Sequence, residues 1–257
     1  MIHHALFVIA LQATGLGTGV SQANERKAPV IRMTGALVIK ATELGDSADQ
    51  ATELTIRFIG NEGFELSDGE TTILTDLPYQ PGAFDYMRYD PEALDPQGRV
   101  ISLITHRHAD HFDEALFLER DWSIIGPVEV TARLPAGRVV PPDPAIKVGE
   151  FTIRAHRTAH SDVEHYSYLV TWRGLRLYFV GDTENPSHLL SVPNLTVAFL
   201  TPWLGCTAAA FGRGIDAETI VLYHHHEGEG TRGCFEARVM QQGESFTLTA
   251  LNSAPPT

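Results

Sequence analysis

The sequence predicts an α/β protein in which two β-sheets pack against each other and short helices cover them. Short runs rich in β-branched and aromatic residues recur in both halves of the chain, bounded by Gly, Asp and Asn. Long amphipathic helical patterns are scarce, and no fixed-period repeat is present. The 257 residues, 43% of them hydrophobic, suit one large domain with a sizeable core better than two small ones.

The first part of the chain is typical of an export signal. Residues 1–23 contain no Lys, Arg, Asp or Glu, and the largely apolar run 5–20 ends near a small-x-small cleavage pattern, Val-Ser-Gln-Ala. We therefore expect a signal peptide over 1–23, a polar linker over 24–29, a folded domain over 30–257, and a periplasmic or secreted protein. Because few positive charges precede the apolar run, a cytoplasmic protein is the alternative.

The first half of the domain is predicted to hold five strands and one helix. Glu53–Asp76 has the pattern of a three-strand meander, and the apolar run Val100–Thr105 is too short for a helix and indicates a buried strand. Asp113–Arg120 is the predicted helix. The expected strands are Gly35–Ala41, Leu54–Ile59, Gly63–Leu66, Thr71–Thr75 and Val100–Thr105.

The second half is predicted to be almost entirely strands. The Arg173-Gly174 pair marks a tight turn between two of them, and the proline-rich stretch 141–144 is interpreted as a rigid surface connection. The expected strands are Phe151–His156, Tyr166–Trp172, Leu175–Val180, Thr196–Leu200 and Ile220–Tyr223.

Charge and cysteine content narrow the range of partners. The chain has 19 Lys and Arg against 32 Asp and Glu, a net charge of −13, so nucleic acid and anionic membranes are repelled. We expect a small-molecule substrate, no nucleic-acid partner and no membrane partner after processing. Cys206 and Cys234 are too few for a disulfide scaffold and too far apart for a Cys-based zinc site. A disulfide between them becomes possible if the chain is exported.

Residues His106, His108, Asp110 and His111 form a cluster directly after the predicted strand Val100–Thr105. In an extended segment the first three share a face, while His111 turns away as the helix begins. Three histidines and an aspartate are costly to place together unless a cation binds them. The cluster therefore predicts metal ligation.

Further donors follow later strands. His160 and Asp182 each lie at the end of a predicted strand, and the triplet His224, His225, His226 follows another. We expect His224 to be the ligand because it directly follows the strand, but either of the other two could take this role. His156, His165 and His188 are interpreted as surface or hydrogen-bonded residues.

These donors can be divided between two metal sites. Two imidazoles and one distant histidine make a three-nitrogen site with an open position for water, as in catalytic zinc sites, and Asp110 with His111 would begin a second site. A ligand set of histidines and carboxylates accepts Zn²⁺, Mn²⁺ or Fe. We expect two zinc ions.

From residue 54 to 226, the order and spacing of the donors resemble the metallo-β-lactamase superfamily. The similar motifs are the His-x-His-x-Asp-His cluster, His160, the Gly181-Asp182-Thr183 turn, a late strand-end histidine and the hairpin around Ile59–Phe64. The resemblance implies a four-layer αββα sandwich. It assigns His106, His108 and His160 to one metal, and Asp110, His111 and His224 to the other, with Asp182 as the bridge.

The resemblance also makes Asp76 a carboxylate that steadies a ligand through a hydrogen bond, although a plain turn residue is an equal alternative. The chain is less similar to true β-lactamases than to the broad hydrolase branch with lactonases and phosphodiesterases. Cys206 is not expected to be a ligand, since Asp182 takes the bridging place.

The expected function is metal-dependent hydrolysis of a small ester, lactone or amide by a hydroxide shared between two zinc ions. Asp110 and His111 are the expected catalytic residues, while the proton donor to the leaving group is left open among Asp110, a histidine of the triplet and metal-bound water. The alternatives are a phosphodiesterase of the same fold and a non-catalytic metal-binding protein that keeps the ligands.

Overall fold

The computed structural model describes residues 52–141, 145–226, 228–230 and 233–250. The expected signal peptide, the linker and the strand Gly35–Ala41 lie outside these residues. In the described part of the chain, no helix has both the length and the apolar character needed to cross a membrane.

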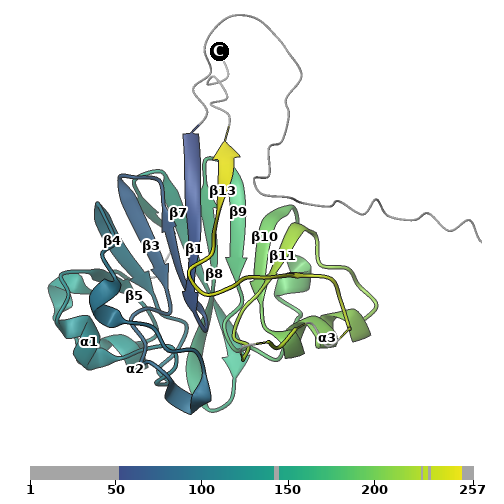
Figure 1. The fold of residues 1–257 in the computed structure, drawn as a ribbon, viewed down its shortest axis with the longest axis horizontal. Coiled ribbons are helices and arrows are strands. Elements are labelled where there is room, and N and C mark those ends of the chain that lie inside the picture. The colour runs from purple at the N-terminus through teal and green to yellow at the C-terminus, as the bar shows by residue number, and fades with distance from the viewer. Residues whose placement is uncertain (1–51, 142–144, 227, 231–232, 251–257) are drawn as a thin grey trace, which may run out of the picture. The chain divides into compact units, whose positions relative to one another are not determined.

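The first sheet has six strands in the order β13-β1-β2-β3-β4-β5 (Figure 1). The predicted meander is confirmed, since β1, β2 and β3 pair antiparallel in sequence. Beyond them, β3, β4 and β5 run parallel. The strands are β1 (Thr52–Gly60), β2 (Gly63–Ser67), β3 (Thr71–Thr75), β4 (Arg99–Leu103), β5 (Ser123–Ile125) and β13 (Ser245–Ala250).

The second sheet has seven strands in the order β12-β11-β10-β9-β8-β7-β6. It is antiparallel from β6 to β9 and parallel from β9 to β12. The predicted turn at Arg173-Gly174 joins β8 to β9. The strands are β6 (Ile146–Val148), β7 (Phe151–His160), β8 (Val163–Trp172), β9 (Leu175–Phe179), β10 (Leu195–Leu200), β11 (Ala217–Leu222) and β12 (Arg238–Val239).

The main core lies between the two sheets. Phe64 of β2 contacts Phe199 of β10, with ring centroids 4.8 Å apart, and Phe179 of β9, at 6.2 Å. Because side chains alternate along a strand, Ile73 of β3 joins this core while Leu74 faces the opposite side. Burying a side chain of this size stabilises the fold by about 1.5–3 kcal/mol.

A second core lies on the outer face of the first sheet, under the helices. Leu74 packs there with Phe117 of α1 and Val130 of α2, and Figure 1 shows both helices beside β4 and β5. The α-helices are α1 (Glu114–Leu118), α2 (Val128–Thr131) and α3 (Pro202–Ala210), and the 3₁₀ turns are η1 (Ala83–Asp85), η2 (Pro91–Ala93), η3 (Ala136–Arg138) and η4 (Leu189–Ser191). The predicted sandwich of two sheets with covering helices is confirmed.

Several elements differ from the expectation. The predicted helix Asp113–Arg120 is shorter, because Asp113 is its N-cap and accepts a hydrogen bond from the Leu116 N–H. The strands β5, β6 and β12 are too short to show a pattern in the sequence. The helix α3 was missed because it has no polar face, although Thr201 caps it and Pro202 occupies its first turn.

Candidate metal centre

The segment after β4 is a turn rather than an extended strand, which corrects the expected geometry. The backbone N–H groups of His111 and Phe112 both donate to the His108 carbonyl, at 3.0 and 2.9 Å. His106 and His108 therefore lie before the turn and Asp110 and His111 within it. Asp110 does not share a face with the first two histidines, and α1 begins only at Glu114.

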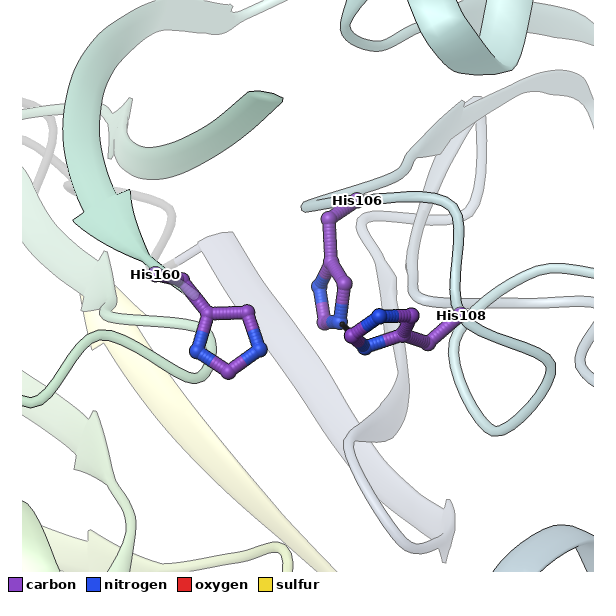
Figure 2. Close-up of side chains that lie close together, drawn as sticks. All are labelled: His106, His108 and His160. Carbon is purple, nitrogen blue, oxygen red and sulfur yellow. Dashed lines mark hydrogen bonds between the residues drawn. The ribbon is translucent and has the colours of Figure 1, made fainter. Parts of the chain in front are cut away.

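Three histidines form the first cluster, shown in Figure 2. His106 Nε2 lies 2.8 Å from His108 Nδ1, and the two rings are nearly perpendicular, at 83°. His160, the last residue of β7, contributes the third ring, with its centroid 4.8 Å from that of His106. The two sheets thus each contribute to one group of nitrogen donors.

Four residues surround a second point beside the first cluster. Asp110 Oδ2 lies 3.5 Å from His111 Nε2 and 3.4 Å from His224 Nε2. Asp182 Oδ2 lies 3.3 Å from the same His111 atom and 3.2 Å from the same His224 atom. In four-coordinate zinc sites, bonds of about 2.0–2.1 Å place the ligand atoms about 3.3–3.4 Å apart. The observed separations match this spacing.

The side chain of Asp182 lies between the two clusters. Its Oδ2 atom is also 3.9 Å from His106 Nε2 and 3.8 Å from His160 Nε2. Gly181 makes this position possible, because its φ is +66° and a Cβ there would come within 2.3 Å of the His165 ring. The turn after β9 is therefore shaped to place one carboxylate between both groups of histidines.

Carboxylates also lie on the outer side of His111. Its Nδ1 is 3.1 Å from Asp76 Oδ2 and 3.3 Å from Glu62 Oε2. An Nδ1–H that faces carboxylates leaves the Nε2 lone pair directed into the second cluster. Asp76 also accepts from the Thr105 N–H at 2.7 Å. The expected hydrogen bond, in which Asp76 accepts from a candidate ligand, is thus present between His111 Nδ1 and Asp76 Oδ2.

Glu62 is the residue at this centre that the sequence analysis missed. It lies in the turn between β1 and β2, is 1% exposed, and neither carboxylate oxygen has a hydrogen-bond partner. Its neighbour Asn61 donates from Nδ2 to the Asp110 carbonyl at 2.7 Å, and the Asn61 carbonyl accepts from the His224 N–H at 2.9 Å. A Gly-Asn-Glu-Gly turn is ordinarily exposed, so no signal in the sequence indicates this burial.

His165 supports Asp182 from behind. Its Nε2 accepts from the Asp182 N–H at 3.0 Å, and its Nδ1 lies 2.8 Å from Thr158 Oγ1. Burial lowers the pKa of His165 to about 3, so the ring is neutral. It is a hydrogen-bonded residue, as expected, but the sequence did not reveal that its partner is the loop of Asp182.

The two clusters differ in their electrostatics. Burial lowers the pKa of His106 far below its ordinary range, and burial also lowers that of His108, so these rings offer neutral lone pairs. Burial would raise the pKa of Asp182, but His224 and His111 hold it well below the usual value. Burial would lower the pKa of His111, but Asp182, Glu62 and Asp76 raise it well above the usual value.

This donor set fits a pair of cations. His111 Nε2 and Asp182 Oδ1 are buried atoms without a hydrogen-bond partner, a costly arrangement for polar groups. The second cluster also gathers several carboxylates in a buried space, where positive charge is needed for balance. Two groups of residues that could hold a metal lie here. His106, His108 and His160 form one, and His111, Asp182 and His224 form the other, together with Glu62 on the outer side of His111.

In the late triplet, the three histidines face different surroundings. His224, with φ +50°, directs Nε2 at Asp110 and Asp182. His226 stacks on Tyr86, with centroids 4.5 Å apart, and Tyr86 also meets the His224 ring edge-on at 4.2 Å. His225 lies toward Phe58 instead. The structure therefore places His224, of the three, beside the other donors.

Aromatic rings and a disulfide surround this loop. Trp203 of α3 meets the His224 ring edge-on, with ring centroids 5.1 Å apart, and Tyr86 contacts the same His224 ring. Burial raises the pKa of Tyr86 to about 12, so its hydroxyl keeps its proton. A disulfide joins Cys206 of α3 to Cys234, with Cα atoms 5.0 Å apart. It connects α3 to the chain segment that follows the histidine triplet.

The chain is a two-sheet α/β sandwich, and two adjacent groups of residues able to hold a metal lie at the ends of its strands. This combination is typical of one class of metal-site proteins. Residues 55–199 match the family model described as the beta-lactamase superfamily domain. The chain belongs to this superfamily. Among curated protein sequences no match was found.

Several solved structures share this fold at low sequence identity. An isothiocyanate hydrolase from Delia radicum gut bacteria is 18% identical over 76% of this chain and 100% of its own, with a TM-score of 0.57. The metallo-beta-lactamase fold protein YhfI from Bacillus subtilis is 16% identical over 76% and 99%, with a TM-score of 0.56. The metallo hydrolase Igni18 from Ignicoccus hospitalis is 16% identical over 77% and 99%, with a TM-score of 0.55. These similarities show the shared fold.

Proposed function

We propose that this protein is a metal-dependent hydrolase that uses two adjacent metal ions to cleave a small ester, lactone or amide. The observation that carries the proposal is the position of Asp182 Oδ2, which lies 3.2–3.9 Å from one nitrogen of each of four histidines. One carboxylate between two groups of imidazoles is the arrangement that a metal pair requires. Hydrolysis is also the activity named for two of the similar structures.

The residues divide into two ligand sets in this proposal. His106, His108 and His160 would hold one ion through neutral nitrogens, and Asp110, His111 and His224 would hold the other, with Asp182 between them. Such a pair, when bound, lowers the pKa of coordinated water and polarises the bond to be cleaved. Zinc is the first choice for this donor set, and manganese and iron are compatible with it.

Asp110 is the better candidate of the two proposed catalytic residues for moving a proton. His111 has one ring nitrogen facing Asp76 and Glu62 and the other facing the cluster, so both of its nitrogens are engaged. The pKa of Asp110 would be raised by burial, but His111 and His224 lower it, so its carboxylate stays ionised at neutral pH. The protonated Tyr86 hydroxyl beside His224 can donate to an oxygen of the substrate.

The disulfide supports the proposal that the protein works in an oxidising compartment, in the periplasm or outside the cell. Disulfides persist in such compartments and are rare where glutathione keeps thiols reduced. Cys206 and Cys234 are paired in the structure, and the described part of the chain holds no free cysteine.

Metal analysis combined with a substrate panel tests the function. The purified full chain is expected to contain two equivalents of metal and to hydrolyse a lactone or a β-lactam in preference to bis-p-nitrophenyl phosphate. His108→Ala removes one nitrogen of the first cluster and is expected to lower both the metal content and the rate. The matched control is His156→Ala, on the same strand as His160 but facing His188 rather than the clusters.

The same experiment separates the alternatives. Cleavage of the phosphodiester alone would make the protein a phosphodiesterase. Two tightly held equivalents of metal with no cleavage of any substrate would favour a non-catalytic metal-binding protein. Retention of full metal content and rate in His108→Ala would overturn the proposed centre.

A further inference from the structure

The loop that carries Asp182 is held in place by side chains of neighbouring strands. Its first residue, Val180, still donates its N–H to the Phe199 carbonyl of β10, at 3.2 Å. Beyond that point, three adjacent backbone groups are bound by side chains instead. Ser167 Oγ donates to the Val180 carbonyl at 2.6 Å, Tyr223 Oη accepts from the Gly181 N–H at 2.6 Å, and His165 Nε2 accepts from the Asp182 N–H at 3.0 Å.

Burial gives these hydrogen bonds control over the loop. Gly181 and Asp182 are buried, and Tyr223 is 1% exposed. A buried N–H group that loses its acceptor is unfavourable, because water cannot replace the lost partner. The acceptors therefore decide where the carboxylate of Asp182 can lie.

Tyr223 differs from the other two side chains because it belongs to a segment with a candidate ligand. Ser167 and His165 both lie on β8, which holds none of the candidate ligands. Tyr223 directly precedes His224 in the chain. Its hydroxyl holds the loop of Asp182, so this one residue connects the two segments.

The connection is rigid at both ends. The Tyr223 N–H donates to the Leu200 carbonyl at 3.1 Å, and the ring packs in the main core, edge-on to Phe64 with centroids 6.3 Å apart. At the other end, Oη lies 2.6 Å from the Gly181 nitrogen and 3.5 Å from the Gly181 carbonyl oxygen. Neither end can shift without disturbing the core or breaking a buried hydrogen bond.

The two connected segments carry a carboxylate and an imidazole that face each other. Asp182 Oδ1 and Oδ2 lie 3.1 and 3.2 Å from His224 Nε2. Metal sites require their ligand atoms to be held within about 0.5 Å of the binding geometry. The spacing of this pair therefore depends on the bond between Tyr223 and Gly181.

We infer that Tyr223 is a positioning residue, which ties the Asp182 loop to the His224 segment and so sets the ligand spacing of the second cluster. Because Asp182 also borders the first cluster, the same tie determines whether one carboxylate reaches both groups of histidines. The inference rests on the proposed function for the metal pair, whereas the tie between the two segments is independent of any reaction.

Amide hydrogen exchange of the metal-free, full-length chain tests the tie itself. Tyr223→Phe keeps the ring and removes the hydroxyl, and the Gly181 N–H is expected to exchange roughly two- to tenfold faster, as measured by NMR. The matched control is Tyr89→Phe, because Tyr89 Oη accepts from the Tyr79 N–H at 3.1 Å and donates to the Tyr79 carbonyl at 3.0 Å. Neither of those residues adjoins a candidate ligand in the chain, and the control is expected to leave Gly181 exchange unchanged.

Metal binding tests the consequence for the centre. In Tyr223→Phe, one of the two zinc-binding steps seen by calorimetry is expected to weaken about 10- to 100-fold, while Tyr89→Phe keeps both. Two manganese ions that share one carboxylate are spin-coupled, and electron paramagnetic resonance distinguishes them from isolated ions. The coupled signal is expected in the wild-type chain and in the control, and to be lost in Tyr223→Phe.

A kinetic measurement separates positioning from general loss of structure. For any substrate that the wild-type chain hydrolyses, Tyr223→Phe is expected to lower kcat about 10- to 100-fold with KM little changed. A folded Tyr223→Phe with wild-type metal affinities and coupling would overturn the inference.

Rapid exchange of the Gly181 N–H in the wild-type chain would also overturn it, whether or not the variant folds. Loss of the coupled signal in Tyr223→Phe, in a protein that hydrolyses nothing, would support the tie and overturn the proposed function.

Discussion

The two ligand clusters of the centre lie side by side but differ in charge and support. The first, His106, His108 and His160, offers only imidazole nitrogens, and His160 keeps 12% of its side chain exposed. The second is almost fully buried and is backed by two further carboxylates, Asp76 and Glu62. Metal binding at a neutral site depends on how the rings are placed, whereas the stability of a buried anionic site depends on a cation that compensates its charge. The second cluster should therefore be the more sensitive to loss of metal.

Replacing Asp182 removes the group that the two clusters share. Asp182→Asn is expected to weaken metal binding at both clusters. Loss of a residue that only hydrogen-bonds to a ligand lowers activity by up to roughly 100-fold, and the loss of hydrolysis in Asp182→Asn is expected to be larger. Zinc titration of the metal-free protein by calorimetry, together with initial rates, measures both effects. A variant that still binds two equivalents with wild-type affinity would show that the clusters are independent.

Replacing Glu62 tests whether the outer carboxylates act on the second cluster alone. Glu62→Gln keeps the shape but removes the carboxyl group that faces His111 Nδ1, a group whose pKa burial raises well above the usual value. We expect affinity for the second equivalent of zinc to fall about 10- to 100-fold while that for the first is unchanged. The matched control, Glu70→Gln, lies on the exposed turn before β3. Equal weakening of both equivalents would erase the distinction between the clusters.

The pH dependence of stability tests the neutral histidine behind Asp182. Since the pKa of His165 is about 3 in the fold against an ordinary value of about 6.5, the unfolded chain binds the proton first as pH falls. Stability due to this residue is therefore full above pH 6.5 and declines by about 1.4 kcal/mol per pH unit toward pH 3.

Urea unfolding of the metal-free protein between pH 7 and 4.5 measures this slope. The second cluster loses stability in a different pH range. Because the pKa values of Asp110 and Asp182 are lowered in the fold, their contribution to stability is lost only below their ordinary pKa of about 4. His165→Gln is expected to reduce the slope between pH 6.5 and 4.5 by the share of one proton, while His106 and His108, whose pKa values are also lowered by burial, keep contributing to it. An unchanged slope would show that His165 does not titrate on unfolding.

The comparison of sequence and structure is clearest at the strands. Alternating apolar patterns predicted the meander of β1, β2 and β3 because one buried face imposes a period of two. Strands of two or three residues, such as β5 and β12, carry too few positions to show that period. The end of β7 was placed too early because residues 157–160 are partly exposed and mostly polar. The start of β8 was placed too late because Glu164 and His165 interrupt the apolar pattern, although Val163 and His165 are buried.

At the candidate site, the sequence was informative where donors are close in the chain. His106, His108, Asp110 and His111 could be recognised together because six consecutive positions contain four donors. Their division between two sites was predicted from the residues and from the family resemblance, although the extended geometry expected for the segment was wrong. Glu62 could not be found, because its position in a glycine-bounded turn gives no sign that loops of the other sheet bury it.

By itself, the sequence determined the class of fold, the main strands and the places where chemistry gathers, because these depend on local periodicity and on donors near strand ends. Only the tertiary structure decided that His224 rather than His225 lies beside Asp110, that Cys206 pairs with Cys234, and that Glu62 lies behind His111. Each of these is a contact between segments far apart in the chain. Such contacts depend on how the two sheets pack, and no local pattern records that.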